Sequence, residues 1–215
     1  MADPSYIGTD GTLTDGEAWV ALNSQICTSR ASSITWKTCY NDSGQDVGGV
    51  NDWSQYLDLV ILGHYRGSAS SVNGNLNIKT YYDATASSAI DFAQCTTNQV
   101  LRTGTSTGVS SYAQGRTSAT WDAGEMTGAG TSHSDGMSSC MMTLSDINSG
   151  KMKNVICIGG AGDNTDQNSY VWFHGASIQV LDPIRALTLW TRNLSQFEVD
   201  TRFDLFGILP RMVNP

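Results

Sequence analysis

The stretch SYVWFHGASI, residues 169–178, carries the pattern that decides the fold. Successive side chains of an extended chain point to opposite faces, so alternate residues share a face. The two sets here are Tyr170, Trp172, His174 and Ala176 on one face and Val171, Phe173 and Gly175 on the other. Such a run of aromatic and β-branched residues predicts a β-strand.

Similar short runs recur along the chain between clusters of Gly, Ser, Asn and Asp, while helical periodicity is nearly absent. The other strand candidates are Ala18–Cys27, Ser33–Thr38, Tyr56–Arg66, Leu76–Tyr82, Gln99–Arg102, Ser138–Leu144, Lys151–Ile158, Ile184–Leu189 and Thr201–Ile208. About ten strands with turn-rich links predict an all-β fold, a single antiparallel β-sandwich of the jelly-roll type. A closed barrel is the alternative.

The domain organisation is simple, because no linker or repeat divides the chain. We expect one domain over residues 1–215, with an N-terminal arm (1–16) and a C-terminal tail (209–215). The segment Thr103–Gly136 is rich in Gly, Ser and Thr and has little apolar content, so it predicts a long loop excursion from the core. Such a loop is either functional and ordered by a partner or simply a mobile surface loop.

Charge is scarce in this chain. Asp, Glu, Lys and Arg make up 15% of its 215 residues, against roughly 25% in an average domain. Ser, Thr, Asn and Gly therefore cover much of the surface, and such surfaces cost little to desolvate against a neighbouring protein. The net charge of −8 argues against a nucleic-acid partner, which would need clustered Lys and Arg; it also serves solubility.

The five cysteines form no CxxC pair and lie in apolar or strand-like surroundings. They predict buried free thiols in a protein that folds in a reducing cytoplasm. The N-terminus lacks the features of a secretory signal, and no apolar run is long enough to span a membrane. We therefore expect no membrane partner.

No constellation of residues predicts catalysis, a metal site or a cofactor. The three histidines lie in unrelated settings, and GGAGDN (159–164) is interpreted as a turn between strands. Two facing acids in an aromatic cleft, which a glycosidase needs, are not apparent. The candidate interaction residues are Trp53 and Trp121, expected in loops where they could line a glycan-binding groove, and Met126 beside them.

An ordered series of strand patterns carries a resemblance to a known class. It comprises YLDLVILGHYR (56–66), LNIKTYYD (76–83), MMTLSDINSGKMKNVICIGG (141–160), SYVWFHGASI (169–178), IRALTLW (184–190) and FEVDTRFDLFGI (197–208). In these patterns the chain resembles the β-sandwich virion proteins of tailed bacteriophages over about 150 residues, beginning near Trp53. The first 50 residues and the tail LPRMVNP are not covered.

The resemblance implies a non-enzymatic jelly-roll-like structural protein of the virion, assembled in the host cytoplasm. A capsid cement or decoration protein is expected first, because the chain has no coiled-coil or β-helical shaft. Its expected partners are the major capsid protein or other virion proteins and further copies of itself, in a homotrimer. The alternative is a tail or head-fibre adhesin that binds host surface glycans.

Overall fold

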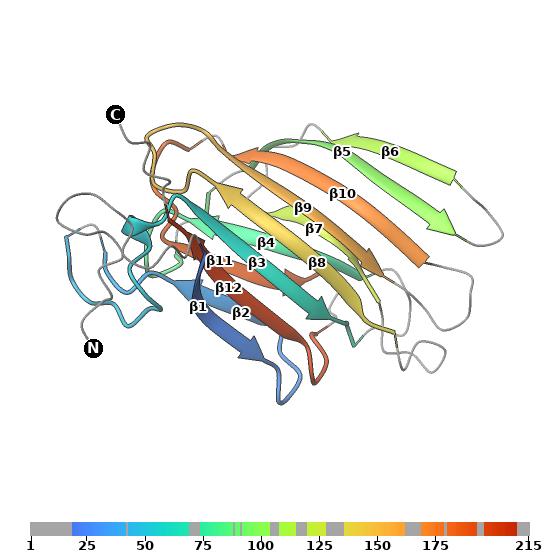
Figure 1. Cartoon of the computed structure of the whole chain (residues 1–215), viewed down its shortest axis with the longest axis horizontal. Coiled ribbons are helices and arrows are strands. Elements are labelled where there is room, and N and C mark those ends of the chain that lie inside the picture. The colour runs from blue at the N-terminus through green and yellow to red at the C-terminus, as the bar shows by residue number, and fades with distance from the viewer. Residues whose placement is uncertain are drawn as a thin grey trace.

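The computed structural model describes residues 19–41, 43–68, 74–87, 89–90, 92–103, 108–114, 120–127, 136–161, 169–178, 180–192 and 196–209. These residues form twelve β-strands and one short 3-10 helix, Trp53–Gln55 (Figure 1). The strands are β1 (Trp19–Ile26), β2 (Ser33–Lys37), β3 (Asp58–Tyr65), β4 (Gly74–Tyr81), β5 (Phe92–Thr103), β6 (Gly108–Gln114), β7 (Trp121–Met126), β8 (Ser138–Ser145), β9 (Lys153–Ala161), β10 (Ser169–Ile178), β11 (Ala186–Thr191) and β12 (Arg202–Ile208).

The strands form two antiparallel sheets that lie one behind the other in Figure 1. The larger sheet has eight strands in the order β1-β12-β3-β8-β9-β10-β5-β6, and the smaller has four in the order β2-β11-β4-β7. One hydrophobic cluster with side chains from both sheets fills the space between them. The predicted antiparallel β-sandwich is therefore confirmed.

The pairing of the strands has the connectivity of a jelly roll. Four antiparallel pairs are nested along the chain: β1 with β12, β2 with β11, β3 with β8, and β4 with β7. The first and third pairs lie in the large sheet, and the second and fourth lie in the small one. This is what results when one long hairpin of eight strands is rolled into two sheets. The remaining strands β9, β10, β5 and β6 extend the large sheet beyond this frame.

Glycines let aromatic rings lie flat on the inner face of the large sheet. Gly63 in β3 pairs with Phe203 in β12, and a Cβ added at Gly63 would lie 2.7 Å from the Phe203 ring. Gly159 in β9 pairs in the same way with Trp172 in β10, where an added Cβ would lie 2.4 Å from the indole. Each ring thus occupies the volume of a missing side chain on the neighbouring strand, which helps to fix the register.

A buried lysine joins two connections at one end of the sandwich. The Lys153 ammonium donates hydrogen bonds of 3.0–3.3 Å to four backbone carbonyls, those of Ser149, Lys151, Val180 and Leu181. Its side chain is buried, and this burial lowers the pKa of the ammonium. The lysine therefore holds the β8–β9 connection against the β10–β11 connection.

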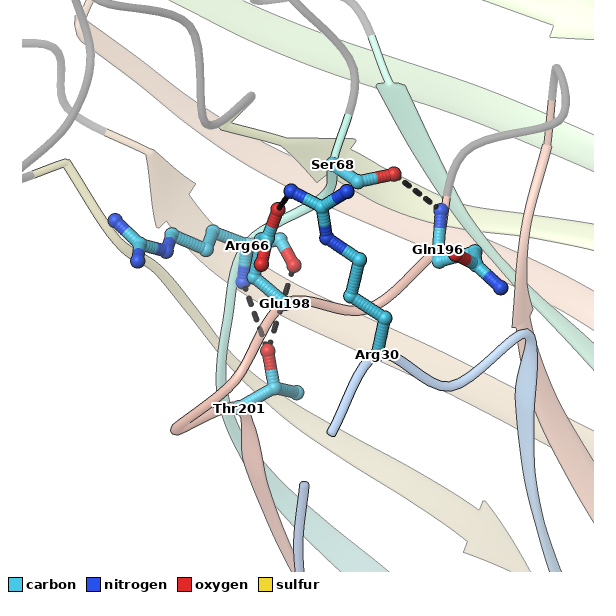
Figure 2. A network of polar contacts seen from close by, with 6 residues as sticks. All are labelled: Arg30, Arg66, Ser68, Gln196, Glu198 and Thr201. Atoms are coloured by element: carbon cyan, nitrogen blue, oxygen red, sulfur yellow. Dashed lines mark hydrogen bonds and ion pairs between the residues drawn. The ribbon is translucent and has the colours of Figure 1, made fainter. Parts of the chain in front are cut away.

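A second polar network ties the β11–β12 connection to two others (Figure 2). The buried Glu198 carboxylate accepts a 2.6 Å ion pair from Arg30, which follows β1, while its backbone N–H donates to the carbonyl of Arg66, which follows β3. Ser68 and Gln196 bond each other through two further hydrogen bonds, and Thr201 bonds the backbone of Arg66. The Arg30 side chain is largely exposed, so this ion pair contributes little to stability.

The segment Thr103–Gly136 differs from the expected excursion, because it supplies β6 and β7. β6 extends the large sheet, and β7 completes the small sheet beside β4. Both are rich in small residues, but cross-strand hydrogen bonds and burial of Trp121 and Met126 hold them in place. The arm 1–16 lies outside the described residues, as does the tail after Leu209.

Candidate interaction surface

A row of apolar side chains crosses the outer face of the large sheet. Leu62 in β3 is paired with Met141 in β8, Met141 with Ile158 in β9, and Ile158 with Phe173 in β10. All four are on the outward register, and between 37% and 44% of each is exposed. Directly paired residues on one face of a sheet are in side-chain contact. The four side chains therefore form one continuous stripe.

The surface around this stripe carries no charge on β8, β9 and β10. Its outward residues are Ser139, Met141, Thr143, Ser145, Asn154, Ile156, Ile158, Gly160, Val171, Phe173, Gly175 and Ser177. These strands contain no acidic residue, and their two basic side chains, Lys153 and His174, are both buried. We call these outward residues, together with Leu62, the uncharged face.

The exposed apolar area of the uncharged face has a free-energy cost in water. Complete burial of a side chain such as Leu, Ile, Met or Phe contributes roughly 1.5–3 kcal/mol. Six such side chains on this face, Leu62, Met141, Ile156, Ile158, Val171 and Phe173, are 37–57% exposed. Covering them recovers about 1 kcal/mol each, or about 6 kcal/mol together. A contiguous patch of this kind marks a binding surface.

The outer face of the small sheet has a different character. Thr35 and Thr188 share a 2.8 Å hydrogen bond between their hydroxyls, and the Lys79 ammonium lies 5.2 Å from the centre of the Trp190 ring. Polar and charged groups there satisfy one another within the sheet. The uncharged face of the large sheet instead presents exposed apolar side chains among uncharged polar ones, so the two outer faces are suited to different surroundings.

The three interaction residues expected from the sequence are not at the surface. Trp53 is the first residue of the 3-10 helix and is completely buried, Trp121 begins β7 with 1% of its surface exposed, and Met126 ends the same strand completely buried. The expectation of exposed loop anchors at these residues is therefore corrected. Each ring or thioether gains more by packing in the core than it would at the surface.

A buried polar group joins β7 and β10 inside the sandwich. The His174 Nδ1 lies 3.0 Å from the backbone oxygen of Asp122, which can only accept, so Nδ1 carries the proton and donates. Burial lowers the pKa of His174 and raises the pKa of the Asp122 carboxyl, which accepts hydrogen bonds from the Asn75 side chain and the Gly124 backbone. These hydrogen bonds link β10 with β7 and β7 with β4.

The cysteines resemble core residues more than a reactive site. Cys27, Cys140 and Cys157 are buried free thiols, and Cys39 is half-buried. The hydrogen bond with Cys140 and burial raise the pKa of Cys157, so its thiol stays protonated. The side chain of Cys95 lies outside the described part of the chain.

A mixed polar pocket of about 380 Å³ opens at the end of the sandwich where the 3-10 helix lies. Its lining includes Tyr40, Asp52, Ser54 and Arg185. The Arg185 guanidinium donates to the side chain of Asn148, which in turn donates to the carbonyls of Trp53 and Tyr56. The pocket is therefore lined by one acidic residue, Asp52, one basic residue, Arg185, and the half-exposed ring of Tyr40. Hydrogen bonding to Asn148 holds the Arg185 guanidinium in place.

Comparison with known proteins finds no relative: no protein-family model, curated protein or solved structure matches the chain. Within the described ranges, no group of three or more His, Cys, Asp or Glu residues is placed to hold a metal ion. None of the helical structure in those ranges is long and apolar enough to cross a membrane. The resemblance of the strand patterns to phage virion proteins thus remains an expectation.

Proposed function

We propose that the chain is a non-enzymatic structural protein of a virus particle, a capsid cement or decoration protein that binds over the junctions of shell subunits. It acts in the virion after assembly in the host cytoplasm, as a homo-oligomer, and its partners are the major capsid protein and other virion proteins. It holds neighbouring subunits together and thereby stabilises the particle.

The uncharged face of the large sheet is the observation that carries this proposal. A face with six exposed apolar side chains and no charge on three adjacent strands is costly in water and favourable against another protein. The jelly-roll frame is a rigid support for such a face, because each strand is paired on both sides from β12 to β10. Only 15% of the residues of the whole chain are Asp, Glu, Lys or Arg. A surface with so little charge suits a protein that is packed against other subunits.

Purified particles with and without the protein test this function. Because only 15% of the residues in the chain are charged, its contacts with the shell should be mainly apolar and neutral polar. Attachment should therefore survive 1 M salt, which screens charges beyond about 3 Å but leaves buried apolar contacts intact. Particles that lack the protein should rupture at a lower temperature, since a bound bridge stabilises the state to which it binds. Absence of the protein from purified particles, or an unchanged rupture temperature without it, contradicts the proposal.

The second candidate function is a tail or head-fibre adhesin, and the pocket beside Tyr40 is the observation that favours it. The acid and the base of the pocket, Asp52 and Arg185, cancel in charge, so a neutral ligand suits it better than an ion. An aromatic ring beside paired donors and acceptors is how proteins bind a neutral sugar. A glycan array with the wild type and Tyr40→Ala tests this: loss of a specific signal in the variant supports the adhesin, and an array without any signal rejects it.

A further inference from the structure

We propose that the uncharged face is the contact between copies of this chain in its homo-oligomer, so that the occupant of the face is a second copy. This inference rests on the proposed function as part of an assembly and names the first partner in that assembly. Neither the strand patterns nor the resemblance to virion proteins indicates which surface is used.

Charge is the first argument for a second copy. The chain has a net charge of −8, so two copies repel each other at long range and need a contact surface that adds no like charges. The outward residues of β8, β9 and β10 provide one, because all of them are uncharged. A partner of different sequence could instead be selected through opposite charges, but this face offers no charge for such a partner to recognise.

The size of the surface is the second argument. Strands lie about 4.8 Å apart and rise about 3.3 Å per residue. The six neighbouring strands β1, β12, β3, β8, β9 and β10 have seven to ten residues each, so together they span roughly 700–800 Å². Beyond β3, the outer surface continues onto β12 and β1. On β12, Arg202 and Asp204 form a 2.9 Å ion pair with each other and add no net charge, and the half-exposed Trp19 packs on Phe206 with ring centres 6.0 Å apart. This approaches the roughly 800 Å² per partner of a stable protein interface.

The residues at the middle of the surface also suit a contact with a copy. Met141, Ile158 and Phe173 are consecutive members of the apolar stripe, and serines, a threonine and glycines surround them. Apolar residues in the centre and neutral hydrogen-bonding residues around them are the usual arrangement of an interface. Two sheets packed in this way would lie about 10 Å apart.

Sedimentation equilibrium of the purified full chain tests the proposal, with Ile158→Glu as the disrupting variant. Ile158 is 43% exposed, so the glutamate can reach solvent in a single copy, whereas in the oligomer it would be buried without a partner. The matched control is Val199→Glu, a position that is 39% exposed in the connection before β12 and away from the uncharged face. Met141→Glu is the second disrupting variant and guards against a folding defect peculiar to Ile158→Glu.

We expect the wild type and Val199→Glu to sediment as the same oligomer, and both face variants to dissociate with a constant at least about a hundredfold weaker. Thermal melts of dilute samples establish that each variant is folded. A monomeric wild type at micromolar concentrations overturns the inference, as does unchanged association of the folded face variants. A monomer that is still abundant in particles would overturn this inference and the homo-oligomeric state but would leave the structural role in the particle standing. An oligomer absent from particles would overturn that role and leave this inference standing.

Discussion

Replacement of Lys153 by methionine tests how much the buried ammonium contributes to the fold. Its three N–H groups serve four backbone carbonyls at 3.0–3.3 Å. Hydrogen bonds to a charged group contribute about 1.5–3 kcal/mol each, while burial of the ammonium costs several kcal/mol. Methionine fills similar volume but leaves buried carbonyls without a donor. The net loss in free energy of unfolding should be about 3 kcal/mol.

Urea unfolding and thermal melts measure this loss. For a domain of this size, about 3 kcal/mol lowers Tm by roughly 6–12 °C. The control is Lys151→Met, because the Lys151 side chain is exposed and only its backbone carbonyl binds the ammonium; its stability should stay within about 0.5 kcal/mol of the wild type. If Lys153→Met is as stable as Lys151→Met, the ammonium does not hold the two connections together and the reasoning is refuted.

Three other variants or treatments probe the interior. Gly63→Ala should destabilise by about 1–3 kcal/mol in urea unfolding, because the added methyl would lie 2.7 Å from the Phe203 ring, whereas Gly150→Ala, with open space around it, should be neutral; equal stability of the two would contradict the packing. Burial lowers the pKa of His174, so its contribution to stability is fully present above the unfolded pKa of about 6.5 and declines as pH falls through the lower folded value. His174→Asn should therefore lose less stability than the wild type between pH 7 and 5, and identical pH profiles would rule out this role. A thiol reagent should label Cys157 in the denatured protein but not in the native one, since burial and a hydrogen bond keep its thiol protonated; rapid native labelling would show that this core opens.

The sequence was a good guide to the strands that have a strong apolar pattern. All ten predicted runs coincide with observed strands, because alternating Val, Ile, Leu and aromatic residues specify both extension and burial. β6 and β7 were missed, since GVSSYAQ and WDAGEM contain too few such residues to show a period. Their strand structure depends on neighbours far along the chain, β5 and β4.

The candidate surface was harder to predict, for a physical reason. Both faces of β10 are apolar, with Trp172 and Ala176 on one and Val171 and Phe173 on the other, so periodicity alone does not say which face is inward. The larger ring of Trp172 occupies the space over Gly159, and Phe173 is left outside. For Trp53 and Trp121 the difficulty is the opposite: the polar residues around them in the sequence favour loops and give no sign of their burial.

The central claim is that the chain is a structural component of a virus particle. Cryo-electron microscopy of the purified particles tests it most directly, because a jelly roll with one eight-stranded and one four-stranded sheet is recognisable in density. The account predicts this fold over the junctions of shell subunits, with Met141, Ile158 and Phe173 covered by protein. Particles without such density, or with this face open to solvent in every bound copy, would contradict it.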